Sequence, residues 1–223
     1  MSIESIIASR AHEHYEDEVS RWKKSVPEAL KGFDIDKLIE NQWNGRLTKA
    51  YTRKFVRYLK NPTQFLILYG PSGLGKTVMG VEVCEKFLTD KVCSSARYVD
   101  TPTLLTELSH PQPGVNPVEV YSKPDILLLD DMGASTTEMT SVRKSGLWAI
   151  INSRWMHGKK TIISTNLPLV PPDDNPMVVS LKDYVGDSSW DRILSSYTML
   201  VFKGKSMRNN RTARPKRNEA EYL

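Results

Sequence analysis

The chain has 223 residues and a mass of 25.3 kDa, which fits one α/β domain with a short appendage better than two full domains. Hydrophobic residues make up 39% of it and aromatic residues 9%, so the composition excludes a wholly disordered chain. No stretch approaches the roughly 18 consecutive apolar residues of a membrane-spanning helix. The N-terminus lacks the pattern of a secretory signal, and Cys84 and Cys93 belong to no metal-ligand motif. These features favour a cytoplasmic protein with reduced thiols and no structural zinc.

The net charge of +5 is unevenly distributed along the chain. Residues 41–81 include seven basic and no acidic residues, and residues 203–217 include another seven basic and no acidic residues. All 26 acids therefore lie elsewhere, so the sequence describes an acidic body with two basic segments. Such a segment is either a solvated face or a surface for a polyanion, and the missing acids make nucleic acid a candidate partner.

Hydrophobic periodicity predicts the elements in chain order. Residues 1–24 place Ile7, Tyr15, Val19 and Trp22 on one face, which predicts an amphipathic helix. This helix either packs on its own domain or docks in a groove of a partner. Further helices are predicted at 47–59, 77–88 and 137–156, and strands at 65–69, 96–100, 126–129, 161–165 and 197–202. Strands alternating with helices predict an α/β fold with a five-stranded, mostly parallel sheet covered on both faces.

A glycine-rich motif follows the first predicted strand and opens a predicted helix, as the mechanism of a phosphate-binding loop requires. Backbone N–H groups and the helix N-terminus of such a loop hold phosphate oxygens. Lys76 is predicted to reach the β- and γ-phosphates of a nucleotide, and the Thr77 hydroxyl to bind Mg²⁺. The motif G-x-x-x-x-G-K-[ST] is formed by Gly70, Pro71, Ser72, Gly73, Leu74, Gly75, Lys76 and Thr77.

Two acids end the strand predicted at 126–129. After a buried strand, Asp130 is predicted to hold Mg²⁺ directly or through water, and Asp131 to polarise a water for attack on the γ-phosphate. Asn166 follows the strand predicted at 161–165, where it is either a turn former or the group that orients this water. A strand lies between the two motifs in sequence, which is typical of P-loop ATPases and not of simple nucleotide kinases.

These residues resemble the AAA+ ATPases of the DnaC/DnaI helicase-loader type, with the transposition helper IstB as a close relative. The resemblance covers about residues 30–208. It rests on the glycine-rich motif, on Leu-Leu-Leu-Asp-Asp-Met-Gly-Ala at 127–134, Ile-Asn-Ser-Arg-Trp at 151–155, Thr-Ile-Ile-Ser-Thr-Asn-Leu-Pro at 161–168, Gly186 with Trp-Asp-Arg-Ile at 190–193, and Gly-Lys-Ser-Met-Arg at 204–208.

The resemblance implies two further site residues. Arg192 looks like the arginine finger that completes a neighbouring subunit's ATP site, and Arg208 resembles the sensor arginine that contacts the nucleotide phosphates. Three departures stand out: Asp131 replaces the glutamate of many AAA+ proteins, Ser188 replaces a second arginine, and the segment 101–123, where loaders contact DNA, is short and interrupted by prolines. After Phe202 only 21 residues remain, which implies a reduced or absent C-terminal lid.

The sequence thus predicts a partner-binding helix at 1–26, an ATPase domain at 27–208 and a flexible basic tail at 209–223. The expected function is an Mg²⁺-dependent ATPase, bacterial or from a bacteriophage, that loads a hexameric, DnaB-type replicative helicase onto single-stranded DNA. It would assemble as a homo-oligomer, a ring or spiral of about six subunits. Two alternatives stay open: an IstB-like transposition helper that binds duplex DNA, and an adaptor that binds ATP without hydrolysing it.

Overall fold

The computed structural model describes residues 3–133 and 139–206. Its centre is a five-stranded sheet in the order β2-β3-β4-β1-β5, in which every neighbouring pair is parallel. The strands are β1 (Phe65–Tyr69), β2 (Ala96–Asp100), β3 (Ile126–Met132), β4 (Lys160–Thr165) and β5 (Tyr197–Val201). The predicted α/β fold and its strands are confirmed, and the sheet is wholly parallel.

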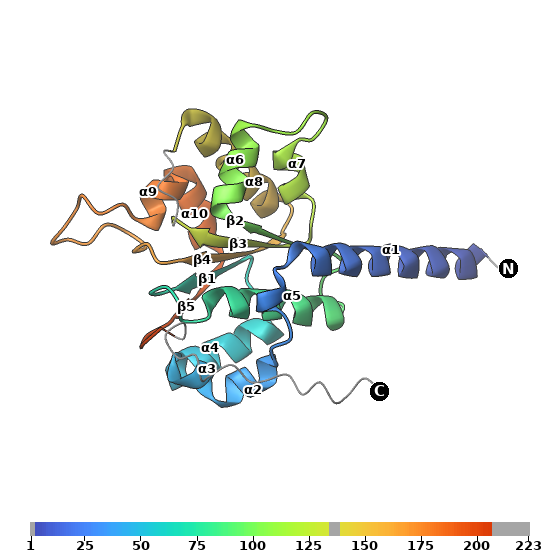
Figure 1. The fold of residues 1–223 in the computed structure, drawn as a ribbon, viewed down its shortest axis with the longest axis horizontal. Coiled ribbons are helices and arrows are strands. Elements are labelled where there is room, and N and C mark those ends of the chain that lie inside the picture. Colours follow the sequence, from blue (N-terminus) through green and yellow to red (C-terminus); the bar gives the residue numbers. More distant parts are fainter. Residues whose placement is uncertain (1–2, 134–138, 207–223) are drawn as a thin grey trace.

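Two layers of helices cover the sheet (Figure 1). One face has α4 (Lys49–Lys60) and α5 (Lys76–Thr89), beside the shorter η1 (Glu28–Leu30), α2 (Ile35–Glu40) and α3 (Gln42–Gly45). The other face has α6 (Thr101–Ser109), α7 (Pro117–Ser122), α8 (Ser141–Met156), α9 (Leu181–Val185) and α10 (Asp187–Ser195). None of the described helices is long and apolar enough to cross a membrane.

Alternation along the strands divides the core into two clusters. Leu66 and Leu68 of β1 pack with α4 and α5, whereas Phe65 and Ile67 pack with the helices of the opposite face. Successive side chains of a strand point to opposite faces, so a strand buried on both sides is apolar at every position. This is why β1 and the first four residues of β3 read as continuous apolar runs in the sequence.

The segment 101–123 folds into two helices although prolines interrupt it. Asp100 and Asn116 accept backbone hydrogen bonds as N-caps of α6 and α7, and Pro102 and Pro117 lie in the first turn of each helix. A proline is tolerated there because the N–H it lacks has no partner within the helix. The interruption predicted from the prolines is confined to the seven residues between the two helices.

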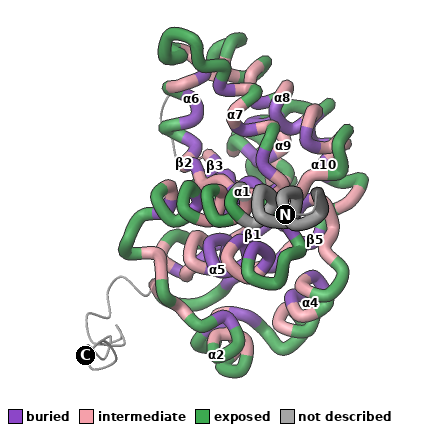
Figure 2. Tube along the Cα trace, turned by 90° about the vertical axis from the view of Figure 1, so that its right-hand side faces the viewer, coloured by how far each residue is buried: buried purple, intermediate pink, exposed green. Residues whose placement is uncertain are grey.

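Helix α1 (Ile3–Ser25) extends away from the domain at its N-terminal end (Figure 1). The second half of α1 packs on the domain: Trp22 is 1% exposed in the core, and the Tyr15 hydroxyl donates to the Leu88 carbonyl at 2.8 Å. Most of α1 with described burial is exposed or half-buried (Figure 2). Tyr15 and Trp22 belong to the predicted apolar face, and both contact the chain itself, which favours the packing alternative for this end of the helix.

Candidate nucleotide site

The glycine-rich loop joins β1 to α5 at the carboxyl edge of the sheet, as predicted. Gly70 has φ +147°, and a Cβ at this position would lie 2.5 Å from the carbonyl oxygen of Phe202, so a larger residue would displace the loop. Gly75 caps α5 in the left-handed region, with φ +85°. Glycine adopts these conformations without strain, and the loop can therefore turn its backbone toward a phosphate.

Lys76 is the first residue of α5 and lies inside the loop. It is 5% exposed, and its Nζ donates to the carbonyl oxygens of Gly70 and Pro71 at 2.7 and 2.9 Å. An ammonium group held there is a positive charge within the curve of the loop. This is the arrangement that neutralises the β- and γ-phosphates in P-loop proteins.

Asp130 is the most tightly held acid of the site. Its Oδ1 accepts hydrogen bonds from Thr77 Oγ1 at 2.9 Å and from Ser164 Oγ, and its Oδ2 accepts one from the Tyr98 hydroxyl at 3.2 Å. Burial raises the pKa of Asp130, although these three hydrogen bonds act to lower it. A divalent cation at this carboxylate would offset the same desolvation cost.

The donor set at this point fits Mg²⁺. Thr77 Oγ1 and Asp130 Oδ1 lie 2.9 Å apart, so a hydroxyl and a carboxylate oxygen face one small volume beside the loop. Mg²⁺ prefers oxygen ligands and is bound by one or two protein groups together with substrate phosphates. Thr77 and Asp130 are therefore the residues that would hold the ion, which serves in such sites to neutralise phosphate charge.

A bulge in β3 separates the two acids. The pairing of β3 with β4 shifts register between Leu129 and Met132, and Asp131 has φ +50°. The Asp131 N–H donates to Ser164 Oγ at 2.9 Å, and Asp131 is exposed at the carboxyl edge while Asp130 is buried. Bulges of this kind re-aim a side chain beside an active site. Here the bulge directs two neighbouring acids into different surroundings.

Asn166 follows β4 at the same edge and is exposed. The Gly70 N–H donates to the carbonyl oxygen of Thr165 at 3.2 Å, so the glycine-rich loop begins beside the residue that precedes Asn166. The structure thus brings the loop, both acids and Asn166 to one edge, because β4 lies between β1 and β3 in the sheet. In open α/β sheets ligands bind at this edge.

Arg192 is not part of this cluster. It lies on α10, on the face of the sheet opposite α5, and the Phe65 N–H bonds the Ser196 carbonyl just after α10, at the amino end of β1. Its guanidinium donates to Asn152 Oδ1 at 2.7 Å and to the Ser188 carbonyl at 2.6 Å. Arg192 therefore cannot complete the nucleotide site of its own chain. Arg208 lies outside the described residues.

Sequence reasoning missed the groups that hold the acids. Ser164 bonds both Asp130 and the backbone of Asp131, and Thr101 Oγ1 donates to the Asp130 carbonyl at 2.8 Å. Ser164 precedes Asn166 by two residues in a buried strand, where a hydroxyl needs a polar partner. The signal in the sequence that could have identified Ser164 was its polar side chain next to two isoleucines in a predicted strand.

Arg154, within the matched motif 151–155, has a structural position. It is fully buried and its guanidinium donates to Thr161 Oγ1 at 2.9 Å and to the carbonyl oxygens of Tyr121 and Pro124 at 3.0 and 2.8 Å. These bonds tie α8 to the segment that leads into β3 and to the start of β4. Arg154 thereby positions the two strands that bear the acids and Asn166.

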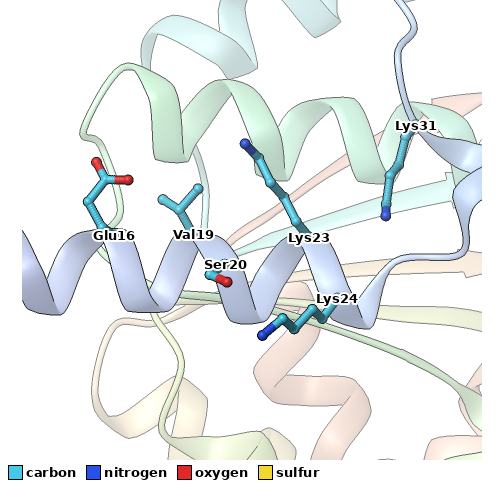
Figure 3. A pocket seen from close by; sticks show the side chains of 6 residues that line it. All are labelled: Glu16, Val19, Ser20, Lys23, Lys24 and Lys31. Atoms are coloured by element: carbon cyan, nitrogen blue, oxygen red, sulfur yellow. The ribbon is translucent and has the colours of Figure 1, made fainter.

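A hollow of about 450 Å³ lies away from these residues, along α1 (Figure 3). Lys31, which contributes to it, pairs with Glu28 at 2.9 Å. No residue of the glycine-rich loop or of the acid pair contributes to its wall, so it is separate from the nucleotide site. The hollow is lined by Glu16, Val19, Ser20, Lys23, Lys24 and Lys31.

Comparisons with known proteins agree with this geometry. Residues 38–215 match the family described as "IstB-like ATP binding protein". None of the curated proteins compared with the sequence matches it.

Three solved structures are similar to this chain. The structure of the DnaC helicase loader has a TM-score of 0.55 at 19% identity and covers 82% of this chain and 99% of its own. The structure of DnaI has a TM-score of 0.54 at 20% identity and covers 69% of this chain and 80% of its own. The structure of AMPPCP-bound DnaA from Aquifex aeolicus has a TM-score of 0.53 at 19% identity and covers 73% of this chain and 49% of its own. Since residues 38–215 span most of the chain, the protein belongs to the IstB-like ATP-binding family and is an AAA+ ATPase whose fold is shared with DnaC, DnaI and DnaA.

Proposed function

We propose that this ATPase loads a hexameric replicative DNA helicase onto single-stranded DNA. The observation that supports this best is helix α1, whose N-terminal part projects from the ATPase domain while Trp22 anchors its other end in the core (Figure 1). A helix anchored at one end presents its free end to a groove in a partner protein. Similarity in fold to a helicase loader whose structure is matched over 99% of its length supports the same proposal.

ATP hydrolysis in this proposal depends on the residues gathered at the carboxyl edge. Lys76 neutralises the β- and γ-phosphates, and Thr77 and Asp130 hold Mg²⁺. Asp131, exposed beside the buried Asp130, polarises the attacking water, and Asn166 orients it. Asp131 is shorter than the glutamate of many AAA+ proteins, so the attacking water must lie closer to the sheet edge.

Arg192 acts on the nucleotide of a neighbouring subunit. It lies on α10, which covers the face of the sheet opposite α5, so the sheet separates it from the glycine-rich loop of its own chain. A guanidinium near the γ-phosphate of a neighbouring subunit stabilises the charge of the transition state and is worth about 10³-fold or more in rate. The surface around it is apolar enough for self-association: Trp148, Met156 and Leu194 are 42%, 66% and 40% exposed. Assembly into a ring or spiral of about six subunits would bring this face to the next nucleotide site. Arg208 would contact the phosphates from the segment after β5.

The test is a pull-down of the cognate replicative helicase by the full chain, with and without ATP, followed by transfer of the helicase to single-stranded DNA. We expect the full chain to retain helicase and a variant without residues 1–12 to lose it, because Tyr15 and Trp22 keep the shortened helix on the domain. Lys76→Ala should keep helicase binding and lose ATP hydrolysis. A full chain that retains no helicase in either condition would refute the proposal.

The expected compartment is the cytoplasm of a bacterium or of a phage-infected host.

The match to the IstB-like family favours a second candidate, a helper ATPase that binds duplex DNA and activates a transposase. The nucleotide site would work in the same way, so the catalytic residues do not separate the two. A gene for a transposase beside this one, together with retention of that transposase and not of helicase, would support the second candidate.

A further inference from the structure

Helix α4 has an uncompensated basic face. Lys49, Arg53, Arg57 and Lys60 recur every three or four residues and are exposed, and no ion pair of the described residues includes any of them. Elsewhere in the described residues, four lysines on or beside helices pair with an acid three or four residues away. Such pairs are Lys31–Glu28, Lys37–Asp34, Lys86–Asp90 and Lys123–Glu119.

This charge pattern destabilises α4 as an isolated helix. Like charges four residues apart, such as Lys49 with Arg53 and Arg53 with Arg57, each cost roughly 0.2–0.5 kcal/mol. The first turn has no acid to offset Lys49, where the helix dipole disfavours a cation. The other side of α4 is buried through Phe55 and Tyr58, at 0% and 1% exposed, so packing on the domain offsets the repulsion. Arg57 and Lys60 lie in the last turn, where the helix dipole favours cations, so favourable and unfavourable terms oppose each other and the basic face is not explained by helix stability alone.

The fold brings the start of the second basic segment, Lys203 and Lys205, close to the N-terminal end of α4. The Lys203 N–H donates to the Arg46 carbonyl at 3.0 Å, just before α4, and the ring of Phe202 meets the Trp43 ring edge-on with centroids 6.4 Å apart. Lys203 and Lys205 are exposed there. Two segments more than 140 residues apart in sequence thus form one basic surface, made by Lys49, Arg53, Lys54, Arg57, Lys60, Lys203 and Lys205.

We propose that this basic surface binds the phosphodiester backbone of nucleic acid without reading its sequence, an inference that rests on the proposed function in DNA handling. From Lys49 to Lys60 the helix rises about 16 Å, which matches the axial rise of roughly five nucleotides of one strand in a B-form duplex at 3.4 Å each. The exposed groups are ammonium and guanidinium ions, which contact phosphates and give no base recognition by themselves.

A lipid surface fits these residues less well. Helices that lie in a membrane interface insert an apolar face between the headgroups. The apolar face of α4 is buried in the core, and no large apolar side chain is exposed on α4 or at 203–205. The surface offers charge alone, which suits an extended polyanion.

The basic surface adjoins the nucleotide site. Phe202, between β5 and Lys203, approaches Gly70 so closely that a Cβ on Gly70 would lie 2.5 Å from the Phe202 carbonyl oxygen. The backbone at 202–203 therefore contacts the glycine-rich loop on one side and the residue before α4 on the other. Nucleic acid on the basic surface would therefore be separated from the nucleotide only by the residues at the end of β5.

The experiment measures how DNA affinity depends on salt. Lys49→Gln, Arg53→Gln and Arg57→Gln are combined in one full-length variant, and Lys37→Gln, Lys123→Gln and Lys182→Gln in a control with the same change of charge. The three control lysines are paired with Asp34, Glu119 and Asp187; Lys37 and Lys123 are exposed, and Lys182 is half-buried. The probes are an oligo(dT) strand of about 30 nucleotides, longer than one binding site, a duplex of mixed sequence, and anionic phospholipid vesicles.

We expect the α4 variant to reduce the slope of log K against log salt by about 2 on the single strand and by up to about 3 on the duplex. The control should keep the wild-type slope. The α4 variant should unfold at or slightly above the wild-type thermal midpoint, because the like-charge repulsion on α4 is removed, and all three proteins should keep the same basal ATPase rate. A slope unchanged in both DNA arms, or reduced equally in the control, overturns the inference, as does a loss confined to vesicles. If the wild type binds neither DNA, the proposed function itself fails, which is a separate result.

Discussion

Ser164 connects the two acids of the nucleotide site, so Ser164→Ala tests how that site is held. The substitution removes a hydrogen bond to the buried Asp130 carboxylate, worth about 1.5–3 kcal/mol, and one from the Asp131 N–H at 2.9 Å. Water can replace the second bond because Asp131 is exposed, which limits that loss to about 0.5 kcal/mol. We expect the free energy of unfolding to fall by about 2–3 kcal/mol.

The same change should slow hydrolysis. Without the Ser164 hydroxyl the bulge that aims Asp131 loses its side-chain anchor, and an orientation loss of about 1.4 kcal/mol lowers kcat tenfold. Denaturant unfolding and phosphate release at saturating ATP and Mg²⁺ measure the two effects. Ser122→Ala is the control, since the Ser122 hydroxyl is buried and no partner for it exists among the described residues. If Ser164→Ala and Ser122→Ala give equal stability and equal kcat, the reasoning is refuted.

Three further predictions concern other parts of the molecule. Arg154→Leu should lower the free energy of unfolding by at least about 3 kcal/mol in denaturant titrations, because buried carbonyl oxygens such as that of Pro124 lose their donor; a loss below about 1 kcal/mol would contradict this. Gly70→Ala should weaken binding of a fluorescent ATP analogue about tenfold or more, through the clash with Phe202. Gly158→Ala is its control, with φ +63° and open space around it, and equal affinities would contradict the steric argument.

The third concerns Glu82, which is 4% exposed and whose pKa burial raises to about 8. The unfolded chain releases this proton near pH 4.5 while the native chain keeps it, so stability from this group is greatest at low pH and falls by about 1.4 kcal/mol per pH unit up to about pH 8. Glu82→Gln should remove that fall, and parallel pH profiles of unfolding in both proteins would contradict the prediction.

Much of the fold was predictable because its strands are buried on both faces. A doubly buried strand is apolar at every position, and so the central strand at 65–69 was found at its observed bounds. The edge strand at 96–100 was also found at its bounds, although only two of its five residues are buried. The helices in 101–123 were missed because their prolines read as interruptions, whereas in the structure Pro102 and Pro117 lie in first turns where proline is tolerated.

In the candidate site, too, some residues were predicted from the sequence and others became apparent only in the structure. Local spacing identified the glycine-rich loop, Asp130, Asp131 and Asn166, since each follows directly from the end of a predicted strand. The roles of Tyr98 and Ser164 depend on contacts with Asp130 between strands that lie 30 or more residues apart in sequence. No local pattern encodes such contacts.

The sequence by itself determined the chemistry of the nucleotide site and the presence of two basic segments, because both are properties of short stretches of chain. Only the tertiary structure decided where these segments lie. The parallel sheet places β5 beside β1, which carries Lys203, the first residue of the second basic segment, to Arg46 in the first segment, near the glycine-rich loop. It also assigned Trp22 to the core and Arg192 to the face opposite α5, since burial and the side of a sheet follow from packing among distant residues.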